Sequence, residues 1–468
     1  MSRDALLDTA ARLRRTMPED FGDGVVISIF DDAAHIARSS VSSGERPTRP
    51  AFDQVLDRAL THRVWGFVVM GTLFFAVFWF TIAGAAVPSD LLYQLLVEGG
   101  HGWLRGGFEA AGSPWWVTGL LVDGVYLGVA WVVAVMLPPM AIFFPLFTLL
   151  EDFGYLPRVA FNLDRLFAGA GAHGKQSLTM MMGYGCNAAG VTATRIIDSP
   201  RERLIAVITN NFSVCNGRWP TLILMGTIFI GSLAPPALAG LLAAASVVLV
   251  AVLGIVTTLV VSWLLSRTVL RGETSVYSLE LPPYRPPQVM RTIYTSMIDR
   301  TLKVLRRALV MAAPAGAVIW LLGNVEVGGA SLAAYAVSGL EPIGWALGLN
   351  GIILLAYLVA IPANEIVIPT ILMLTLTLGH TAAGGDAGVM VNLSDAQAGS
   401  VLVDVGGWTL LTAINLMLFC LLHNPCSTTM LTIWRETRSL KWTTVATLLP
   451  LGLACLVCGV VAVLWRAF

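Results

Sequence analysis

The sequence predicts an all-α polytopic membrane protein with about 7–9 membrane segments, built as two repeats of inverted topology with discontinuous helices. Three observations carry this prediction. Of the 468 residues, 56% are hydrophobic and only 12% are charged, against roughly 25% charged in ordinary soluble domains. The apolar residues gather in runs of about the 20 residues that cross a bilayer. Lysine and arginine are concentrated in alternate loops between those runs.

Uninterrupted apolar runs are the first candidates for membrane spans. They lie at 64–87, 118–149, 204–230, 237–266, 303–323, 400–422 and 443–466, and each is long enough to cross. Two further apolar stretches, 175–194 and 346–379, are interrupted by Gly, Pro, Asn or Glu. Backbone that leaves the helix inside a membrane is tolerated only where it is buried in protein or lines a cavity. We therefore expect re-entrant or discontinuous helices at these two stretches.

Positive charge predicts the orientation, because Lys and Arg in short loops favour the cytoplasmic side. The segments 151–203, 269–302 and 423–442 hold 13 Lys and Arg, whereas the segments 88–116, 231–236, 324–345 and 379–399 hold one, Arg105. Residues 1–60 also lack the apolar core of a signal peptide. We therefore expect the N-terminus to lie in the cytoplasm.

With this orientation, the first broken stretch begins and ends inside and the second outside, with the same order of helices around each. Inverted repeats with matching interruptions are typical of secondary transporters, which bind substrate at the interruptions. The segments "CNGRWPTLI" from Cys215 and "CSTTMLTIW" from Cys426 occupy equivalent places in the two repeats. The predicted organisation is a cytoplasmic helical segment at 1–60, a first transmembrane helix and external loop at 61–116, one repeat at 117–268, a cytoplasmic amphipathic connector at 269–302 and the second repeat at 303–468.

Polar groups inside the interrupted segments are the candidates for a solute pathway, because a charged side chain at mid-bilayer costs at least ~2.5 kcal/mol. Glu365 lies between Pro362 and Pro369, which break the helix around it. A structural Glu paired with an Arg is the alternative. In "GYGCNAAG", "NNFSVCNGR" and "LHNPCSTT" a thiol lies beside carboxamides. Thiol, carboxamide and carboxylate together suit a borderline-soft divalent transition metal, with plain packing as the alternative for each Cys.

The predicted metal or substrate pathway thus combines thiols, amides, a carboxylate and an imidazole. Its residues are Cys186, Asn187, Asn211, Cys215, Asn216, Asn364, Glu365, His423 and Cys426. Secondary candidates are Glu151 and Asp152 at the inner end of a span and Met182 just before Cys186. An interfacial charge cluster with Arg158 is the alternative for the two acids, and apolar filling is the alternative for Met182.

Two enzyme-like motifs occur without the context that they need. "GAGAHGKQ" at 169–176 nearly spells a P-loop, but Gln176 replaces the Mg²⁺-binding Ser or Thr and no hydrophobic strand precedes it. "CLVC" at 455–458 has redox spacing but no neighbouring cation to stabilise a thiolate. We expect no nucleotide hydrolysis, no nucleic-acid binding and no permanently bound cofactor. The rivals are a transporter of another divalent metal or of a nucleoside-like solute, and an intramembrane thiol oxidoreductase built on "CLVC".

Taken together, these motifs resemble the membrane part of the ferrous iron transporter B (FeoB) family. The matching residues are "THRVWG" at 61–66, "LLEDFGYLPRVAFNLDRLF" at 149–167, "GYGCNAAGVTATRIIDSPRERLIAVITNNFSVCNGRWPTLI" at 183–223, "LELPPYRPP" at 279–287, "IPANEIVIP" at 361–369 and "LLHNPCSTTMLTIWRETRSLKWT" at 421–443. The resemblance covers about residue 8 to the C-terminus. The sequence departs from many members at Ala188-Ala189, where Val-Pro is common, and at 216–220, where Ser-Ala-Arg-Leu-Pro is common.

The resemblance implies a multi-pass importer of Fe²⁺ in a bacterial or archaeal inner membrane, not an enzyme, with Fe²⁺ as the transported ion. Cys residues of the family's two gate regions are the usual candidates for metal contact, and they correspond to Cys186, Cys215 and Cys426. Members usually begin with a G-protein domain and a helical spacer, whereas this sequence starts near the end of the spacer with "LRRTMPEDFGDGVVISIFDDAAHIARS". A separate small GTPase, docking on residues 1–60 and the inner loops, and a small accessory protein are the expected partners, besides the lipid bilayer. Transport without nucleotide is the alternative to the separate GTPase. Assembly as a homo-oligomer is left open.

Overall fold

The computed structural model describes residues 21–40, 52–62, 64–172, 174–271, 284, 288–378 and 395–467. The regular structure of these residues is helical, apart from one antiparallel pair of short strands, β1 (Glu326–Val327) and β2 (Ala330–Ser331). Six of the described helices are long and apolar enough to cross a membrane, or up to seven if a bent pair counts as one span. The prediction of an all-α polytopic membrane protein is confirmed.

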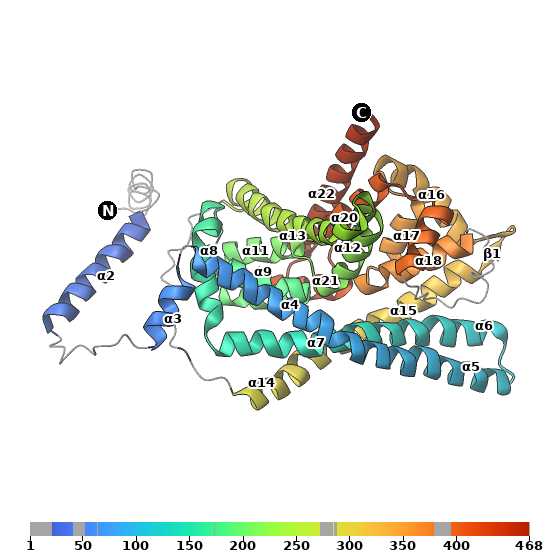
Figure 1. Ribbon diagram of the computed structural model, residues 1–468, viewed down its shortest axis with the longest axis horizontal. Coiled ribbons are helices and arrows are strands. Elements are labelled where there is room, and N and C mark those ends of the chain that lie inside the picture. Colours follow the sequence, from blue (N-terminus) through green and yellow to red (C-terminus); the bar gives the residue numbers. More distant parts are fainter. Residues whose placement is uncertain are drawn as a thin grey trace, which may run out of the picture.

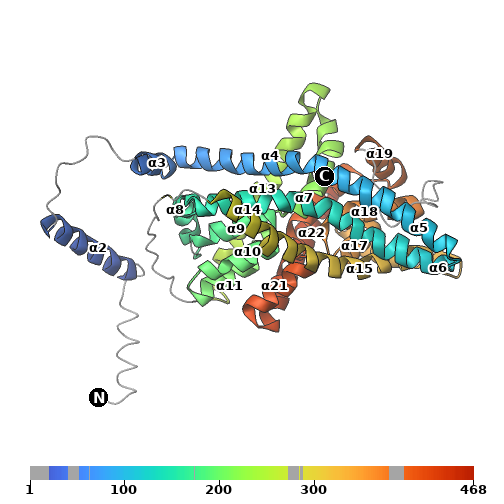
Figure 2. The ribbon, with the colours of Figure 1, turned by 90° about the horizontal axis from the view of Figure 1, so that it is seen from below.

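Two long helices run antiparallel along one side of the molecule (Figure 2). The first joins α4 (Trp65–Leu92), the π-helical η1 (Tyr93–Gly100) and α5 (His101–Ala110) over 46 residues, a length of about 69 Å at 1.5 Å per residue. The second joins α6 (Trp115–Thr118), η2 (Gly119–Tyr126) and α7 (Leu127–Asp152). The segment predicted as an external loop is therefore mostly the helical tip of this hairpin.

The remaining elements follow in two groups along the chain. The first predicted repeat, 117–268, also takes in η2 and α7 of the hairpin, and α14 and η8 of the second group lie in the predicted connector. The first group is α8 (Tyr155–Gly169), α9 (Lys175–Gly185), α10 (Asn187–Ala193), η3 (Thr194–Ile196), α11 (Pro200–Thr209), η4 (Asn210–Phe212), η5 (Asn216–Arg218), α12 (Trp219–Met225), η6 (Gly226–Ile230), η7 (Gly231–Leu233) and α13 (Pro236–Arg267). The second group is α14 (Val289–Thr295), η8 (Ser296–Leu302), α15 (Lys303–Asn324), α16 (Leu332–Ala346), α17 (Gly351–Val359), η9 (Asn364–Ile366), α18 (Val367–Leu378), α19 (Asp395–Ser400), η11 (Val401–Val405), α20 (Leu410–Leu422), α21 (Ser427–Thr437) and α22 (Leu440–Ala467). Ahead of both lie α2 (Phe21–Ser40) and α3 (Phe52–Leu60).

Two runs that were predicted to be continuous spans are interrupted. In the run 204–230, α11 ends at Thr209 and α12 begins only at Trp219, because Pro220 in its first turn lacks the amide that would continue an earlier helix. In the run 400–422, the chain turns at Gly407, which has a φ of +62°. The helix that follows belongs to a span reaching from Leu410 to Thr437.

The two stretches predicted to be broken are broken. Cys186 separates α9 from α10 with φ −156° and ψ 120°, and Ala363 precedes η9 with nearly the same angles, φ −153° and ψ 118°. Both residues are followed by an asparagine. Cys215 (φ −76°, ψ 166°) and Cys426 (φ −63°, ψ 159°) form a second matching pair. The backbone angles are thus similar at places that the sequence analysis predicts to be equivalent, and the inverted repeat itself stays a prediction.

Helix α15 crosses η2 at a distance that leaves no room for side chains on either of two facing glycines. A Cβ atom on Gly316 would collide with the backbone carbonyl of Gly124, and a Cβ on Gly119 would collide with the ring of Trp320. Small residues at helix crossings permit the close backbone packing that holds membrane helices together without a hydrophobic driving force. This glycine crossing therefore fixes the first long helix of one repeat against that of the other.

An ion pair docks α3 on α8 at the end of the molecule where the N-terminal segment joins (Figure 1). Nε of Arg158 donates to Oδ1 of Asp57 at 3.0 Å, and the hydroxyl of Tyr284 donates to the same oxygen at 2.7 Å. Burial would raise the pKa of Asp57, but the hydrogen bonds from Arg158 and Tyr284 and the charge of Arg158 hold that pKa below its ordinary value. Three distant segments of the chain are thereby joined.

The connector predicted at 269–302 is helical from Val289 and continuous with α15; its residues 272–283 and 285–287 lie outside the described residues. It packs against the end of α7. Thr292 donates to Asp152 at 2.6 Å, and Arg300 donates to Glu151 at 3.2 Å. The charge cluster of these two acids therefore forms with the connector and not with Arg158.

Gly316→Ala is expected to destabilise the protein by about 1–3 kcal/mol, because the new methyl group fits only if the backbones of α15 and η2 move apart. Gly323→Ala is the matched control on the same helix, since a Cβ there meets nothing within 4 Å. The thermal midpoints of both purified variants in one detergent provide the measurement. Equal midpoints would show that the crossing is not tightly packed.

Candidate functional site

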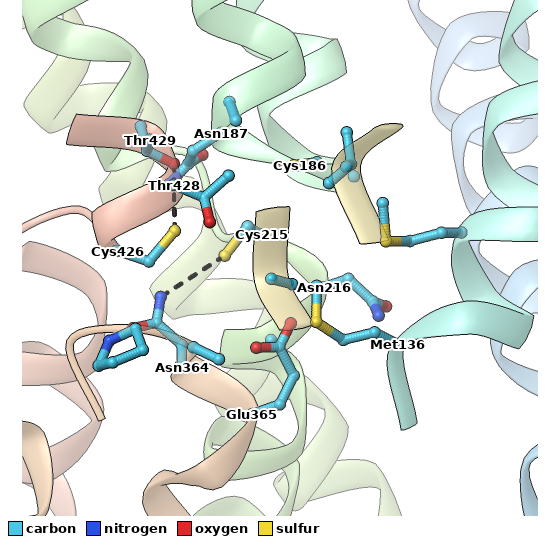
Figure 3. Close-up of a pocket in the computed structure, with 18 residues that line it drawn as sticks. Met136, Cys186, Asn187, Cys215, Asn216, Asn364, Glu365, Cys426, Thr428 and Thr429 are labelled. Atoms are coloured by element: carbon cyan, nitrogen blue, oxygen red, sulfur yellow. Dashed lines mark hydrogen bonds between the residues drawn. The ribbon is translucent and has the colours of Figure 1, made fainter. Parts of the chain in front are cut away.

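Four helix breaks meet around one pocket. Figure 3 shows side chains from all four pointing into a common space, with α7 and α15 closing its sides. The lining residues are Met136, Met140, Gly185, Cys186, Asn187, Ala188, Cys215, Asn216, Gly217, Val304, Ala308, Pro362, Ala363, Asn364, Glu365, Cys426, Thr428 and Thr429. The cavity volume is about 40 Å³, room for roughly three water-sized spheres.

Cys186 reaches the pocket because the helix that carries it stops there. Gly185 precedes it, and a Cβ atom on Gly185 would collide with the ring of Phe143 on α7. The chain therefore passes α7 at backbone distance and leaves α9 in an extended conformation at Cys186. Because Cys186 is extended, its thiol lines the pocket. In a continuous helix the side chain would lie along the preceding turn instead.

Asn187 joins the first break to the second. It is buried at the start of α10, and Asn210 donates to its backbone carbonyl at 2.9 Å. With the amide oriented so that both ends are satisfied, the Asn187 nitrogen donates to the carbonyls of Gly183 at 3.0 Å and Ser213 at 3.2 Å. Backbone groups that the interrupted helices leave without partners are thus satisfied by side-chain amides.

Asn364 joins the two repeats across the pocket. Its nitrogen donates to the sulfur of Cys215 at 3.9 Å (Figure 3), and its oxygen lies 3.3 Å from Nε2 of His423. The other ring nitrogen, Nδ1, lies 2.8 Å from the carbonyl oxygen of Cys420. The imidazole packs against the ring of Tyr357, with ring centroids 4.7 Å apart.

Cys426 occupies in the second repeat the place that Cys215 has in the first. Its sulfur lies 3.2 Å from the hydroxyl of Thr429, in the first turn of α21. The backbone amide of Ser427 donates to the carbonyl of Ile361 at 2.8 Å. The two breaks of the second repeat are therefore hydrogen-bonded to each other, as are those of the first.

The carboxylate of Glu365 lies against the opposite repeat. A Cβ atom on Gly217 would be 2.6 Å from both its carboxyl carbon and Oε1, so glycine at this position makes room for the acid. None of the ion pairs found among the described residues includes Glu365. The alternative of a structural Glu paired with an Arg is thus not observed there.

Arg218 is fully buried and connects the repeats behind the pocket. Its Nη1 donates to the backbone carbonyls of Asn211 at 2.7 Å and Leu421 at 3.0 Å, and its Nη2 donates to the carbonyl of His423 at 3.2 Å. The last two carbonyls belong to the C-terminal end of α20, which carries the negative end of the helix dipole. Asn211 adds a bond from its own side chain to the His423 carbonyl at 2.7 Å.

The structure thus brings seven of the predicted pathway residues to the pocket, and these are Cys186, Asn187, Cys215, Asn216, Asn364, Glu365 and Cys426. Asn211 and His423 do not line it. Asn211 holds the end of α20 by donating to the His423 carbonyl, and the His423 ring lies against Asn364. Glu151, Asp152 and Met182 do not line the pocket. The roles of all twelve in transport stay predictions.

Several lining residues carry no sequence signal. Met136 and Met140 reach the pocket from α7, and Thr428 and Thr429 reach it from α21. Methionine and threonine are common in apolar helices, so only the spacing of the two methionines, four residues apart, hinted at a shared face. In the part of the chain that the structure describes, no three His, Cys, Asp or Glu side chains are close enough together to hold a metal ion.

The two enzyme-like motifs have structural roles. Gln176, the last residue of "GAGAHGKQ", is buried and donates to the hydroxyls of Thr209 at 2.8 Å and Ser262 at 3.1 Å. Cys458 of "CLVC" is buried and donates to the carbonyl of Asn415 at 3.5 Å. Both contacts join helices of one repeat.

Arg218→Met is expected to lower stability by about 1–3 kcal/mol for each backbone carbonyl left without a donor. Arg218→Lys should recover only part of this, because one ammonium group cannot reach all three carbonyls in the guanidinium geometry. Thermal midpoints in detergent measure the effect, with Arg435→Met as the exposed control. A midpoint for Arg218→Met equal to that of the control would contradict the structural role of Arg218.

Two family models match the chain. One, described as "Gate: Nucleoside recognition", matches residues 133–229 and 305–440, and the other, described as "Ferrous iron transport protein B C terminus", matches residues 247–300. The first of them includes every residue that lines the pocket except Val304. No solved structure matches significantly.

Curated relatives named "Fe(2+) transporter FeoB" match over most of the chain. That of Staphylococcus aureus strain MSSA476 is 28% identical over 411 residues, which are 86% of this chain and 57% of the relative. That of Synechocystis sp. is 27% identical over 457 residues, or 95% of this chain and 69% of the relative. A fusion of Fe(2+) transport protein A with FeoB from Porphyromonas gingivalis is 32% identical over 267 residues, or 57% of this chain and 30% of the relative. This chain thus corresponds to about 57% of the length of the S. aureus relatives, and it belongs to the FeoB family as a counterpart of the transmembrane portion.

Proposed function

We propose that the chain moves Fe²⁺ across the membrane into the cytoplasm through the pocket at which the four helix breaks meet. The observation that carries this proposal is the convergence of three thiols and one carboxylate, drawn from both repeats, on a single cavity. The names of the relatives refer to Fe(2+) transport by those proteins. The N-terminus lies on the cytoplasmic side in this proposal, as the charge pattern predicts.

The donor set fits a divalent ion of borderline softness. Thiol sulfur and amide or carboxylate oxygen together favour first-row transition metals over Mg²⁺ or Ca²⁺, which prefer oxygen alone. The cavity of about 40 Å³ can hold an ion that keeps part of its hydration shell. Because no three strong ligands are preassembled among the described residues, the ion is held weakly enough to leave again, as conduction requires.

Access to the pocket changes when the repeats move against each other. An ion pair between them supplies one contact that must break. Nε and Nη2 of Arg195 on η3 donate to the carboxylate of Glu436 on α21 at 2.9 and 2.7 Å. The pair lies on the side that the charge pattern predicts to be cytoplasmic, and the Arg195 side chain is 65% exposed. Separation of α10 from α21 would open the pocket toward that side.

Two rivals are disfavoured by observations at the site. Three thiols and two methionines line the pocket, and these soft sulfur groups suit a transition metal better than a nucleoside. A thiol oxidoreductase at "CLVC" would need a reactive thiolate. Cys458 is instead buried, and its thiol donates a hydrogen bond to the carbonyl of Asn415. Transport of another first-row divalent metal uses the same ligands and is decided by competition experiments.

Energy input from a small GTPase supplied in trans, and contact with a small accessory protein, are part of the proposal. The fusion relative of P. gingivalis joins a protein named Fe(2+) transport protein A to FeoB in one chain, which supports the accessory partner. Asp57 on the N-terminal helix α3 accepts a hydrogen bond from Arg158 on α8. A partner that binds and moves α3 would therefore also move the membrane helices.

The test is Fe²⁺ uptake by an iron-starved host that lacks its own importers. Cys215→Ser with Cys426→Ser is expected to lower uptake at least tenfold, because hydroxyls replace two soft ligands, one from each repeat, in the cavity. Cys455→Ser with Cys458→Ser is the matched control, since these two thiols lie outside the pocket. Unchanged uptake in the first variant would refute the thiol pathway, and loss in the control alone would favour the oxidoreductase.

A further inference from the structure

Two methionines of α7 line the pocket together with the thiols and the carboxylate. Figure 3 shows the Met136 side chain extending from α7 toward Glu365, and Met140 lines the same cavity. Residues four apart on a helix share one face, so both side chains project together. Pro138 and Pro139 lie between them and remove two amide donors from this turn of α7.

From this arrangement we infer that Met136 and Met140 are specificity-determining contacts, which favour soft transition-metal ions over harder ones. The inference rests on the proposed function and adds the residues that select the cargo. Glu365 and any deprotonated thiol attract every divalent cation through charge. A thioether is neutral at all pH values, so its contribution depends on the softness of the ion alone.

The position of the thioethers suits an ion in transit. Met140 is nearly buried and its backbone carbonyl accepts from Thr301 at 3.5 Å, which ties this turn of α7 to η8. Met136 is partly buried and packs against both large apolar clusters of the molecule. Neutral sulfur beside charged or polar groups lets an ion exchange ligands without leaving a charge unpaired in the membrane.

The alternative is that both methionines only fill space, and the two explanations predict different results. Met136→Leu with Met140→Leu keeps the apolar volume, and such exchanges usually cost less than about 1.5 kcal/mol. A purely structural defect would lower the transport of all ions in proportion. Loss of selection would change the ratio between ions.

The experiment measures initial uptake of labelled Fe²⁺ and of labelled Mn²⁺, the harder ion, by cells expressing the full chain. The double Leu variant is expected to reduce the Fe²⁺ to Mn²⁺ uptake ratio by a factor on the order of 10, the lower range for residues that tune a metal site, with Mn²⁺ uptake retained. Met181→Leu is the control, because Met181 lies on α9 outside the pocket.

An unchanged ratio, or an equal fall for both ions, would overturn the inference while leaving the proposed Fe²⁺ pathway in place. The pathway itself fails by a different result, namely unchanged Fe²⁺ uptake when Cys215 and Cys426 are replaced by serine. The two failures are therefore distinguishable in the same assay.

Discussion

Interrupted helices inside a membrane leave backbone carbonyls and amides without partners, and the need to satisfy them is the constraint on which this structure depends. Arg218 satisfies this need at the end of α20, where its guanidinium donates hydrogen bonds to the carbonyls of Leu421 and His423. The side-chain amide of Asn210 donates to the carbonyl of Asn187, and the backbone amide of Ser427 donates to the carbonyl of Ile361. Each of these bonds crosses from one break to another, so the breaks can exist only as a group.

The same constraint brings the functional groups together. A side chain on a regular helix is aimed along its own turn, whereas Cys186, Cys215 and Cys426 lie on extended residues at helix ends. Glycines bring the other elements within reach, since Gly185 lets α7 pass at backbone distance and Gly217 leaves room for the carboxylate of Glu365. The pocket is thus a consequence of where the helices stop.

The sequence alone predicted the fold class and much of the site, because thiols, amides and an acid are conspicuous in apolar stretches. The sequence did not predict features that depend on contacts between residues far apart in the chain. The run 204–230 was taken as one span although Asn210 and Pro220 interrupt it, since its overall apolar content is high. The capping role of Arg218 depends on α20, which is about 200 residues away, and the contribution of Met136 is invisible because methionine also fills ordinary cores.

Direct metal binding tests the central claim that thiols of both repeats share one cation. The full chain, purified in detergent, would be titrated with Co²⁺, whose thiolate complexes absorb in the near ultraviolet. We predict a thiolate-to-metal absorption band that disappears in Cys215→Ser and in Cys426→Ser but persists in the variant lacking Cys455 and Cys458. A band that survives both pocket substitutions, or no band in the unmodified chain, would contradict the account.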